Sequence, residues 1–276
     1  MKRRRFLTSS LATAAAITAD ARLARAQSTQ SSETANTTAG NKQREYYELR
    51  RYHLESGPQT KLTNTYLEEA LIPGLNRLGM KPIGVFNLEV GVETPSIYVL
   101  IPSNSLETLV RSEFRLREDD QYMKAGEAFL SAPAKEPAFT RVESSLMIAF
   151  EGWPKLILPP VSGKEGKRVF ELRTYESPSN ADHVRKVEMF HSGEFGAFER
   201  AGFWQVFFGD VLIGPRLPKL TYMLGFPDLS ERNAKWKAFQ SDPEWKKLTS
   251  SSRFNYENIV SNVTNVMVAP TAYSQV

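Results

Sequence analysis

The chain of 276 residues has no cysteine and only three histidines, His53, His183 and His191. Without cysteine it can form neither a zinc–thiolate site nor a thiol nucleophile, and no disulfide can support its fold. The histidines are scattered through the sequence, which disfavours a transition-metal site built from closely spaced ligands. We therefore predict no metal site. We also expect His53 and His183 to be solvated residues near element ends.

Several sequence motifs are missing too. There is no P-loop, no G-x-G-x-x-G after a strand, no G-x-S-x-G and no H-E-x-x-H. Chemistry that depends on a phosphate-binding loop, a serine nucleophile or a zinc-binding helix therefore lacks its usual support. Long apolar segments are also absent. The run from Leu11 to Ala19 is too short to span a bilayer, so we expect no permanent membrane anchor.

The first 26 residues have the three parts of a secretory signal peptide. A basic start, from Lys2 to Arg5, precedes the apolar run, and Ala24-Arg25-Ala26 matches a small-residue cleavage site. Paired arginines followed by x-Phe-Leu are typical of a twin-arginine signal. We predict a bacterial protein exported by the twin-arginine machinery and cut near Ala26, with a periplasmic or extracytoplasmic mature chain. The alternative is a cytoplasmic protein that begins with a basic amphipathic helix.

Positive charge is concentrated in this segment. Six of the 35 Lys and Arg, and one of the 31 Asp and Glu, precede Gln27, which leaves 29 basic and 30 acidic side chains. A nearly neutral mature chain offers no basic surface that would release counterions from nucleic acid. We therefore expect no nucleic-acid partner.

The rest of the sequence contains two diverged copies of one unit. The segment from Tyr47 to Tyr52 reappears at 170–175, at an offset of 123 residues. The segment from Leu75 to Gly79 reappears at the same offset. A single offset that relates two separated pairs of segments indicates a duplication.

The boundaries of the two units follow from composition. Residues 27–43 are polar and predict a flexible leader. Proline and glycine residues between 152 and 167 are typical of a connection. We therefore predict a first unit at 44–152, a linker at 153–166 and a second unit at 167–270.

Both units have the same expected order of elements, which is the βαββαβ order of ferredoxin-like domains. Gly79 and Gly202 follow the long helices, where a residue with positive φ is needed, and Asp242-Pro243 is typical of a helix start. The fold class is therefore α+β with tandem ferredoxin-like units. The expected strands and helices cover 46–52, 60–78, 81–90, 96–101, 105–130 and 139–150, and then 168–175, 180–201, 203–210, 219–225, 229–248 and 257–268.

The opening strand of each unit alternates between two faces. One face is apolar, and the other carries a row that we call the Glu-Arg-Tyr row: Glu48, Arg50 and Tyr52 in the first unit, and Glu171, Arg173 and Tyr175 in the second. We expect the apolar face to cover the helices. The row would then be solvated or, if two such sheets close against each other, would line the interior of a barrel.

The sequence resembles the NIPSNAP family, a branch of the dimeric α/β-barrel superfamily. The resemblance rests on the repeated Y-E-L-R-x-Y pattern, the long helix before a glycine and the D-P-E-W segment that ends at Trp245. The first unit departs by lacking the Asp-Pro pair and by having Tyr122 in place of the tryptophan. The resemblance implies a pseudo-dimer of two units packed sheet to sheet, with a cavity between sheet and helices or inside the barrel. The resemblance implies no particular reaction. Some members of the superfamily use haem as a cofactor, and others use none.

Each Glu-Arg-Tyr row offers a chemical role and a structural one. The Glu48–Arg50 and Glu171–Arg173 pairs could orient Tyr52 or Tyr175 as a proton donor and contact a ligand. They could equally be structural ion pairs that hold the barrel together. Which role applies depends on what the rows face.

His191 lies at the edge of the predicted buried stripe of the second long helix, facing the sheet. It could bind haem iron or act as a base, with Arg173 and Tyr175 as further catalytic candidates. The alternative is a histidine at the edge of the core that is satisfied by hydrogen bonds, because its counterpart in the first unit is Glu68.

Three functions remain open from the sequence. The first is an exported protein that binds a small apolar or aromatic molecule in a barrel cavity through the Glu-Arg-Tyr rows. The second is a cofactor-independent monooxygenase-like or haem-dependent enzyme. The third is a structural or interaction module. A homo-oligomer is expected in each case, and the sequence leaves open whether the two units close on each other.

Overall fold

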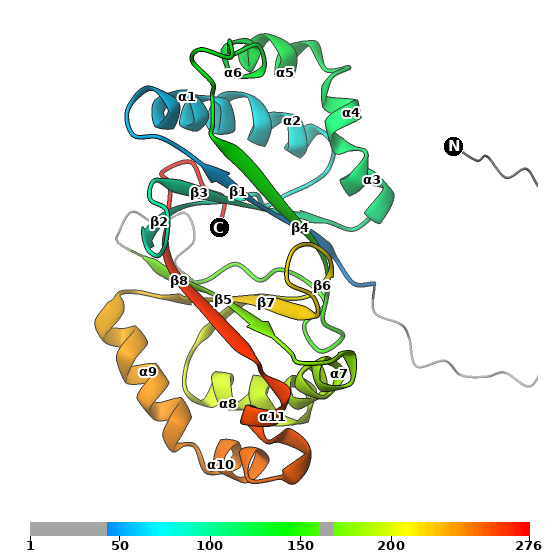
Figure 1. Ribbon diagram of the computed structural model, residues 1–276, viewed down its shortest axis with the longest axis vertical. Coiled ribbons are helices and arrows are strands. Elements are labelled where there is room, and N and C mark those ends of the chain that lie inside the picture. The colour runs from blue at the N-terminus through cyan, green and yellow to red at the C-terminus, as the bar shows by residue number, and fades with distance from the viewer. Residues whose placement is uncertain (1–42, 161–167) are drawn as a thin grey trace, which may run out of the picture. The chain divides into compact units, whose positions relative to one another are not determined.

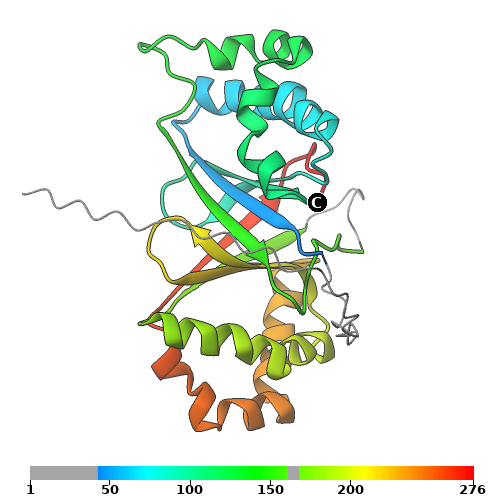
Figure 2. The ribbon, with the colours of Figure 1, turned by 90° about the vertical axis from the view of Figure 1, so that its right-hand side faces the viewer.

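The computed structural model describes residues 43–160 and 168–276. The predicted signal peptide, the leader up to residue 42 and residues 161–166 of the predicted linker lie outside the described residues. The described residues 43–160 and 168–276 belong to one compact unit, shown in Figures 1 and 2. No helix in the described ranges is long and apolar enough to cross a membrane.

The first repeat has the expected βαββαβ order. Its four strands are β1 (Tyr46–His53), β2 (Gly84–Val90), β3 (Ser96–Ser103) and β4 (Arg141–Ala149). Its long helix is continuous from Pro58 to Arg77, with a π-helical turn in the middle, and its later helical segment consists of short pieces. These elements are α1 (Pro58–Tyr66), η1 (Leu67–Leu71), α2 (Ile72–Arg77), α3 (Leu106–Val110), α4 (Ser112–Leu116), α5 (Asp120–Ala125) and α6 (Glu127–Leu130).

The second repeat has the same order at the predicted offset. Its strands are β5 (Val169–Glu176), β6 (Trp204–Ile213), β7 (Lys219–Phe226) and β8 (Asn262–Pro270). One expectation is wrong here: residues 256–259 form a helical turn, so the last strand begins five residues later than predicted. The remaining elements are α7 (Asn180–Met189), η2 (Phe190–Glu194), α8 (Phe195–Arg200), α9 (Leu229–Ser241), α10 (Pro243–Thr249), η3 (Ser252–Phe254) and α11 (Tyr256–Ile259).

Local signals account for several helix ends. Gly79 and Gly202 take φ values of 82° and 75° after the long helices, as predicted. The carboxylate of Asp242 accepts a hydrogen bond from the backbone N–H of Trp245, and Pro243 stands in the first turn of α10. These residues satisfy or replace backbone donors that a helix end would otherwise leave without partners.

The eight strands form one closed barrel in the order β1-β3-β2-β8-β5-β7-β6-β4. Each repeat contributes four neighbouring strands, and two antiparallel pairings between repeats, β2 with β8 and β4 with β6, close the circle. The barrel therefore closes within one chain. Closure leaves no strand edge unpaired, which is why two half-sheets of this kind are stable together.

The helices of the two repeats lie on opposite sides of the barrel, α1 to α6 on one side and α7 to α11 on the other (Figures 1 and 2). Each helix layer encloses its own apolar core against the outer surface of its half-sheet. A third core fills much of the barrel interior. Its residues come from both repeats and include Tyr47, Phe86, Leu100, Met147, Phe170, Leu172, Phe207, Met223 and Val268.

The orientation predicted for the opening strands is wrong. Tyr47 and Phe170 face the barrel interior, whereas Tyr52 and Tyr175 belong to the cores beneath the helices. The Glu-Arg-Tyr rows therefore face the helices and do not line the barrel. The physical reason is that both surfaces of these strands are buried, so an apolar face does not by itself identify the helix side.

Candidate functional site

The barrel interior contains a cavity of about 220 Å³, which we call the mouth cavity. It lies where β1 and β5 finish and β7 begins, because the inward side chains there are shorter or more polar than those deeper inside. Leu49, Leu172 and Val266 form its apolar wall. The polar lining consists of Arg51, Glu143, Ser144, Ser145, Thr174, Arg216, Lys219, Thr221, Thr264 and Asn265.

The interior next to this cavity is filled by aromatic rings. The rings of Tyr47 and Phe207 lie 5.3 Å apart, and those of Phe86 and Phe170 lie 5.1 Å apart. Val276, after the last strand, is also buried in this cluster. The apolar cluster gives the mouth cavity a solid floor, so that the cavity is a recess in the barrel and not a channel through it.

Two β-hairpins, one from each repeat, border the mouth cavity. Gly91 and Val92 of the β2–β3 hairpin line it, as do Pro215 and Arg216 of the β6–β7 hairpin. The two turns have the same backbone geometry, with a non-glycine residue in the left-handed region followed by a cis X-Pro bond. The duplication thus placed equivalent loops at the same end of the barrel.

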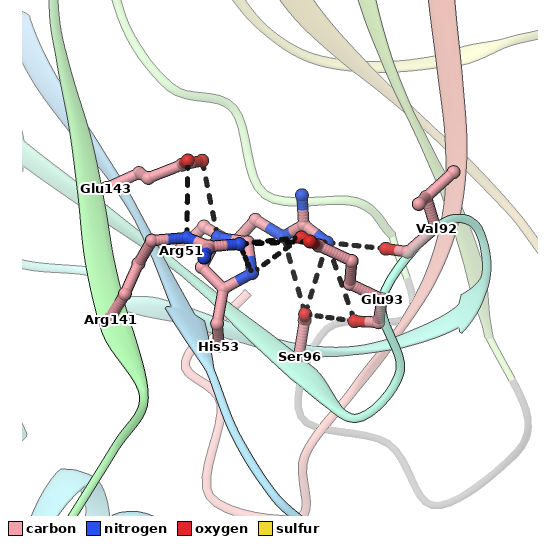
Figure 3. A network of polar contacts seen from close by, with 7 residues as sticks. All are labelled: Arg51, His53, Val92, Glu93, Ser96, Arg141 and Glu143. Carbon is pink, nitrogen blue, oxygen red and sulfur yellow. Dashed lines mark hydrogen bonds and ion pairs between the residues drawn. The ribbon is translucent and has the colours of Figure 1, made fainter.

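A network of charged side chains surrounds His53 at the edge of this cavity (Figure 3). Nδ1 of His53 lies 2.8 Å from a carboxylate oxygen of Glu93, and Nε2 lies 3.3 Å from Glu143. Arg141 donates to Glu93 at 3.0 Å. The hydrogen bond from Arg141 holds the pKa of Glu93 below its usual value, and the charges of His53 and Arg51 add to this. His53 is buried and paired, so the expectation of a solvated residue is wrong.

Arg51 connects this network to the cavity. Its guanidinium donates to the backbone carbonyl of Val92 at 2.5 Å and to the hydroxyl of Ser96 at 3.2 Å. It also lies 5.5 Å from the centre of the Tyr98 ring. These contacts fix the hairpin and place a positive charge at the wall of the cavity.

Lys219 is the first residue of β7 and points into the barrel opposite Glu176. Only 6% of its surface is exposed, and no residue in the described ranges forms a hydrogen bond or an ion pair with its ammonium group. Burial lowers the pKa of Lys219, and the charge of Arg216 lowers it further, against the opposite effects of Glu176 and Glu143. The cavity therefore contains an amine on a largely buried side chain, and this amine is available to a ligand.

The first Glu-Arg-Tyr row is enclosed between β1 and the helices. Arg50 donates to both carboxylate oxygens of Glu48, at 2.7 and 2.9 Å, and to Glu113 of α4 at 2.6 Å. The expected Glu48–Arg50 ion pair is therefore present. A cleft of about 280 Å³ adjoins the pair, lined also by Leu109 and Ile213. Tyr52 is buried within the helix-side core, away from this cleft.

The second row forms a denser network. The carboxylate of Glu171, which has no exposed surface, accepts from Arg173 at 2.6 Å, from Arg232 at 2.8 and 2.9 Å and from Trp236 at 2.8 Å. Burial alone would raise the pKa of Glu171, but the hydrogen bond from Arg232, the charge of Arg173 and the hydrogen bond from Trp236 hold it below its usual value. Two residues of α9 thus cover this row.

Arg173 also binds the hydroxyl groups of two tyrosines. It donates to Tyr175 at 2.8 Å and to Tyr222 at 2.8 Å, and the two hydroxyls lie 2.8 Å from each other. The predicted contact between Arg173 and Tyr175 is therefore present. Burial raises the pKa of Tyr222 well above its usual value, so that its hydroxyl remains protonated at neutral pH.

A buried ion pair beside this network was not predicted from the sequence. Nζ of Lys186 lies 2.5 Å from Glu194, and both side chains are almost fully buried. The equivalent residues of the first repeat are Thr63 and Leu71, so the pair exists in one repeat only. A comparison of the two copies at the 123-residue offset could have identified it, because a charge replaces an apolar residue at a core position.

His191 does not fit a haem ligand or a base in this structure. Its Nε2 accepts a hydrogen bond from the backbone N–H of Gly152 at 3.0 Å, and its Nδ1 lies 2.9 Å from the carbonyl oxygen of Val187. Both ring nitrogens are therefore engaged. These two hydrogen bonds connect the turn after β4 to the second long helix. His191 is therefore satisfied by hydrogen bonds, as in the alternative given above, but it is exposed and does not lie at the edge of the core.

His183 is buried, contrary to expectation. Its Nε2 lies 2.7 Å from a carboxylate oxygen of Asp210 on β6, which attaches the start of α7 to the barrel. The described ranges contain no group of three His, Asp or Glu side chains arranged to hold a metal ion.

The mouth cavity was not predicted from the sequence, because its polar residues lie on strand faces that are apolar along most of their length. Arg51 and Thr174 continue the apolar faces of β1 and β5, and Lys219 and Thr221 do the same on β7. A polar residue at the end of an otherwise apolar inward face is the signal that could have indicated a lined cavity.

Solved structures with the same fold include two proposed monooxygenases. One, from Lactobacillus acidophilus NCFM, has a TM-score of 0.55 at 8% identity and covers 82% of this chain and 94% of its own. The other, from Fusobacterium nucleatum, has a TM-score of 0.52 at 8% identity and covers 82% of this chain and 92% of its own. At this identity the likeness concerns the fold alone.

A NIPSNAP-like domain protein from Burkholderia xenovorans is 17% identical and covers 40% of this chain and 90% of its own, with a TM-score of 0.36. No curated protein matches the sequence. The NIPSNAP family model matches twice, over residues 47–151 and 170–275. The chain therefore belongs to the NIPSNAP family, and its two copies of the family's domain together close one α/β barrel.

Proposed function

We propose that this protein is exported and binds a small molecule in the mouth cavity. The observation that carries the proposal is that one recess of the barrel combines an apolar wall with the ammonium group of Lys219. This side chain is largely buried, and its ammonium group has no hydrogen-bond or ion-pair partner among the described residues. Charges with little access to water are normally paired. A ligand with an oxygen-bearing head group would supply the missing partner.

The size and lining of the cavity limit the ligand. About 220 Å³ is less than the roughly 300 Å³ at which sites for drug-sized molecules begin. The apolar wall suits a compact ring or short alkyl body, and the hydroxyls of Thr174 and Thr221 suit polar atoms on its head. The ligand that we propose is therefore a small amphipathic molecule, bound by these residues and not by the Glu-Arg-Tyr rows.

Two of the functions left open by the sequence receive less support. The charges of the Glu-Arg-Tyr rows are paired within the protein, which favours a structural role for them. The likeness to proposed monooxygenases concerns the fold and supplies no reacting residue. Export by the twin-arginine route and assembly into a homo-oligomer remain predictions from the sequence.

Binding of benzoate, measured by ligand-observed NMR titration on the mature chain, tests the proposed function. We expect saturable binding that Lys219→Met weakens by about 10- to 100-fold, since a hydrogen bond to a charged group contributes roughly 1.5–3 kcal/mol. Lys219→Arg, which keeps the charge, should retain most of the binding. Lys237→Met, a change at an exposed lysine of α9, should have no effect.

A larger side chain in the apolar wall of the mouth cavity provides an independent test of where benzoate binds. Val266→Phe should fill the cavity and abolish benzoate binding while circular dichroism shows an intact fold. Binding that does not saturate in the wild type, or that survives both Val266→Phe and Lys219→Met, would show that the mouth cavity is not the site.

A further inference from the structure

Lys219 differs from the other described basic residues at the mouth of the barrel. Arg51 donates to Val92 and Ser96, Arg216 pairs with Glu176 at 2.9 Å, and Arg141 pairs with Glu93 at 3.0 Å. In the described ranges, Lys219 alone among the basic residues that line the mouth cavity has neither a hydrogen bond nor an ion pair.

The strand register keeps this amine in place. Lys219 is followed on the same face of β7 by Thr221, whose hydroxyl lies 3.0 Å from that of Thr174 on β5. The apolar wall formed by Leu172 and Val266 borders the same recess. A molecule with its body against this wall would have its head group among one amine and two hydroxyls.

We propose that Lys219 binds a small aldehyde or ketone covalently, as an imine, in the mouth cavity. This inference rests on the proposed function, because it requires that the cavity is a ligand site, and it names the chemical class of the ligand. It goes further in assigning Lys219 as a nucleophile. A ligand carboxylate that simply pairs with the ammonium group is the competing outcome.

The chemical step balances without any oxidant or reductant. The lone pair of the neutral Nζ attacks the carbonyl carbon, a C–N bond forms as the C=O π bond breaks, and one nitrogen proton passes to the oxygen to give a carbinolamine. The second nitrogen proton then passes to this hydroxyl as the C–O bond breaks and the C=N bond forms, and one molecule of water leaves. The Thr174 and Thr221 hydroxyls are placed to hydrogen-bond the oxygen during this exchange.

Two properties of the site favour the neutral amine that this step needs. Burial disfavours the charged ammonium form, and the nearby positive charge of Arg216 acts in the same direction. The carboxylates of Glu176 and Glu143 oppose them, but Glu176 is engaged by Arg216 and Asn262, and a carboxylate oxygen of Glu143 lies 3.7 Å from the guanidinium of Arg141. Amines activated in this way are the lysines that form imines with carbonyl compounds.

Reductive trapping with benzaldehyde tests the inference. The mature chain is incubated at pH 7.5 with benzaldehyde and sodium cyanoborohydride, which reduces an imine to a stable secondary amine, and labelled residues are found by peptide mass spectrometry. We expect Lys219 to be labelled at least ten times faster than the exposed Lys237. Equal labelling of Lys219 and exposed lysines in the folded wild-type chain would overturn the proposal.

The Lys219→Arg variant distinguishes imine formation from simple ion pairing. Arginine keeps the positive charge but cannot form the imine, so benzoate binding should persist and the fast phase of labelling should disappear. If benzoate binds the wild type but benzaldehyde leaves Lys219 unlabelled, the imine is refuted and the proposed function stands. If neither probe occupies the cavity, both are refuted together.

Discussion

Glu93 and Arg216 occupy the same position of the two β-hairpins, 123 residues apart, and carry opposite charges. Both have left-handed backbones, with φ values of 65° and 57°. Each pairs with the last inward residue of the first strand of its own repeat: Glu93 with His53 at 2.8 Å, and Arg216 with Glu176 at 2.9 Å. His53 and Glu176 are themselves equivalent. The two copies have therefore kept the pairing geometry and reversed its sign.

Glu93→Gln should loosen the first hairpin. The change removes the carboxylate that His53 and Arg141 share, and we expect amide hydrogen exchange at residues 91–96 to become several-fold faster. The equivalent residues 214–219 of the second hairpin serve as an internal control and should not change. Equal protection of both hairpins in the variant would show that the pairing does not hold the turn.

The same carboxylate predicts a pH dependence. The pKa of Glu93 is lowered in the folded protein, mainly by the hydrogen bond from Arg141. Its stabilising effect is therefore complete above the unfolded pKa of about 4.3 and is lost as the pH falls through the folded value. Wild-type protection at residues 91–96 should decrease only in that acidic range, whereas the Glu93→Gln variant should show no such step.

Removing one partner of the buried Lys186–Glu194 pair should destabilise the protein strongly, whereas replacing both partners with apolar side chains should change its stability little. Lys186→Met leaves the carboxylate of Glu194 buried without its partner, and we expect a loss of about 3–5 kcal/mol in the free energy of unfolding. The double variant Lys186→Met, Glu194→Leu resembles the first repeat, which has Leu71 at the second position, and should recover to within about 1 kcal/mol of the wild type. Urea unfolding measures both.

The defect of the single variant should depend on pH. Burial raises the pKa of Glu194, against the charge of Lys186, so removal of the lysine raises this pKa further. A raised folded pKa means that stability is present below the unfolded pKa and is lost as the pH rises through the folded value. Lys186→Met should therefore be less destabilising near pH 4 than at pH 7, and a defect independent of pH would contradict this account.

Arg173→Ala distinguishes a structural row from a ligand site. The change removes one partner of the fully buried Glu171 and the donor to two tyrosine hydroxyls, so we expect a loss of about 3–5 kcal/mol in urea unfolding. Benzoate binding by the remaining folded protein should be unchanged. Arg253→Ala, which breaks the exposed pair with Glu188, should change the free energy of unfolding far less, because water screens that pair. Unchanged stability with lost benzoate binding would instead make the row a ligand site.

The arginine pair near the N-terminus predicts the export route. Arg3→Lys together with Arg4→Lys should stop export through the twin-arginine machinery, because that signal is read through its paired arginines. Cell fractionation and intact-mass measurement should then find an uncut chain inside the cell, whereas the wild type should begin near Gln27. Unimpaired export of the variant would point to the general secretory route.

The duplicated architecture could be predicted because it depends on local signals. The offset that relates Tyr47 to Phe170 also relates the two helix-ending glycines, and these patterns specify the element order without knowledge of distant contacts. The Glu48–Arg50 and Glu171–Arg173 ion pairs were also predictable, since residues two apart on a strand share a face. The last strand was placed too early because Tyr256 to Ile259 form a short helix, which hydrophobic alternation does not distinguish from a strand end.

The sequence by itself determined the two ferredoxin-like units and the charged row on each opening strand. Only the tertiary structure decided what those rows face, how the two half-sheets join through β2–β8 and β4–β6, and that Lys219 meets Arg51 and Thr174 around one cavity. The physical reason is that alternation specifies two faces of a strand but not which one is enclosed by helices. In a closed barrel both faces are buried, and the residues that share its interior are far apart in the chain.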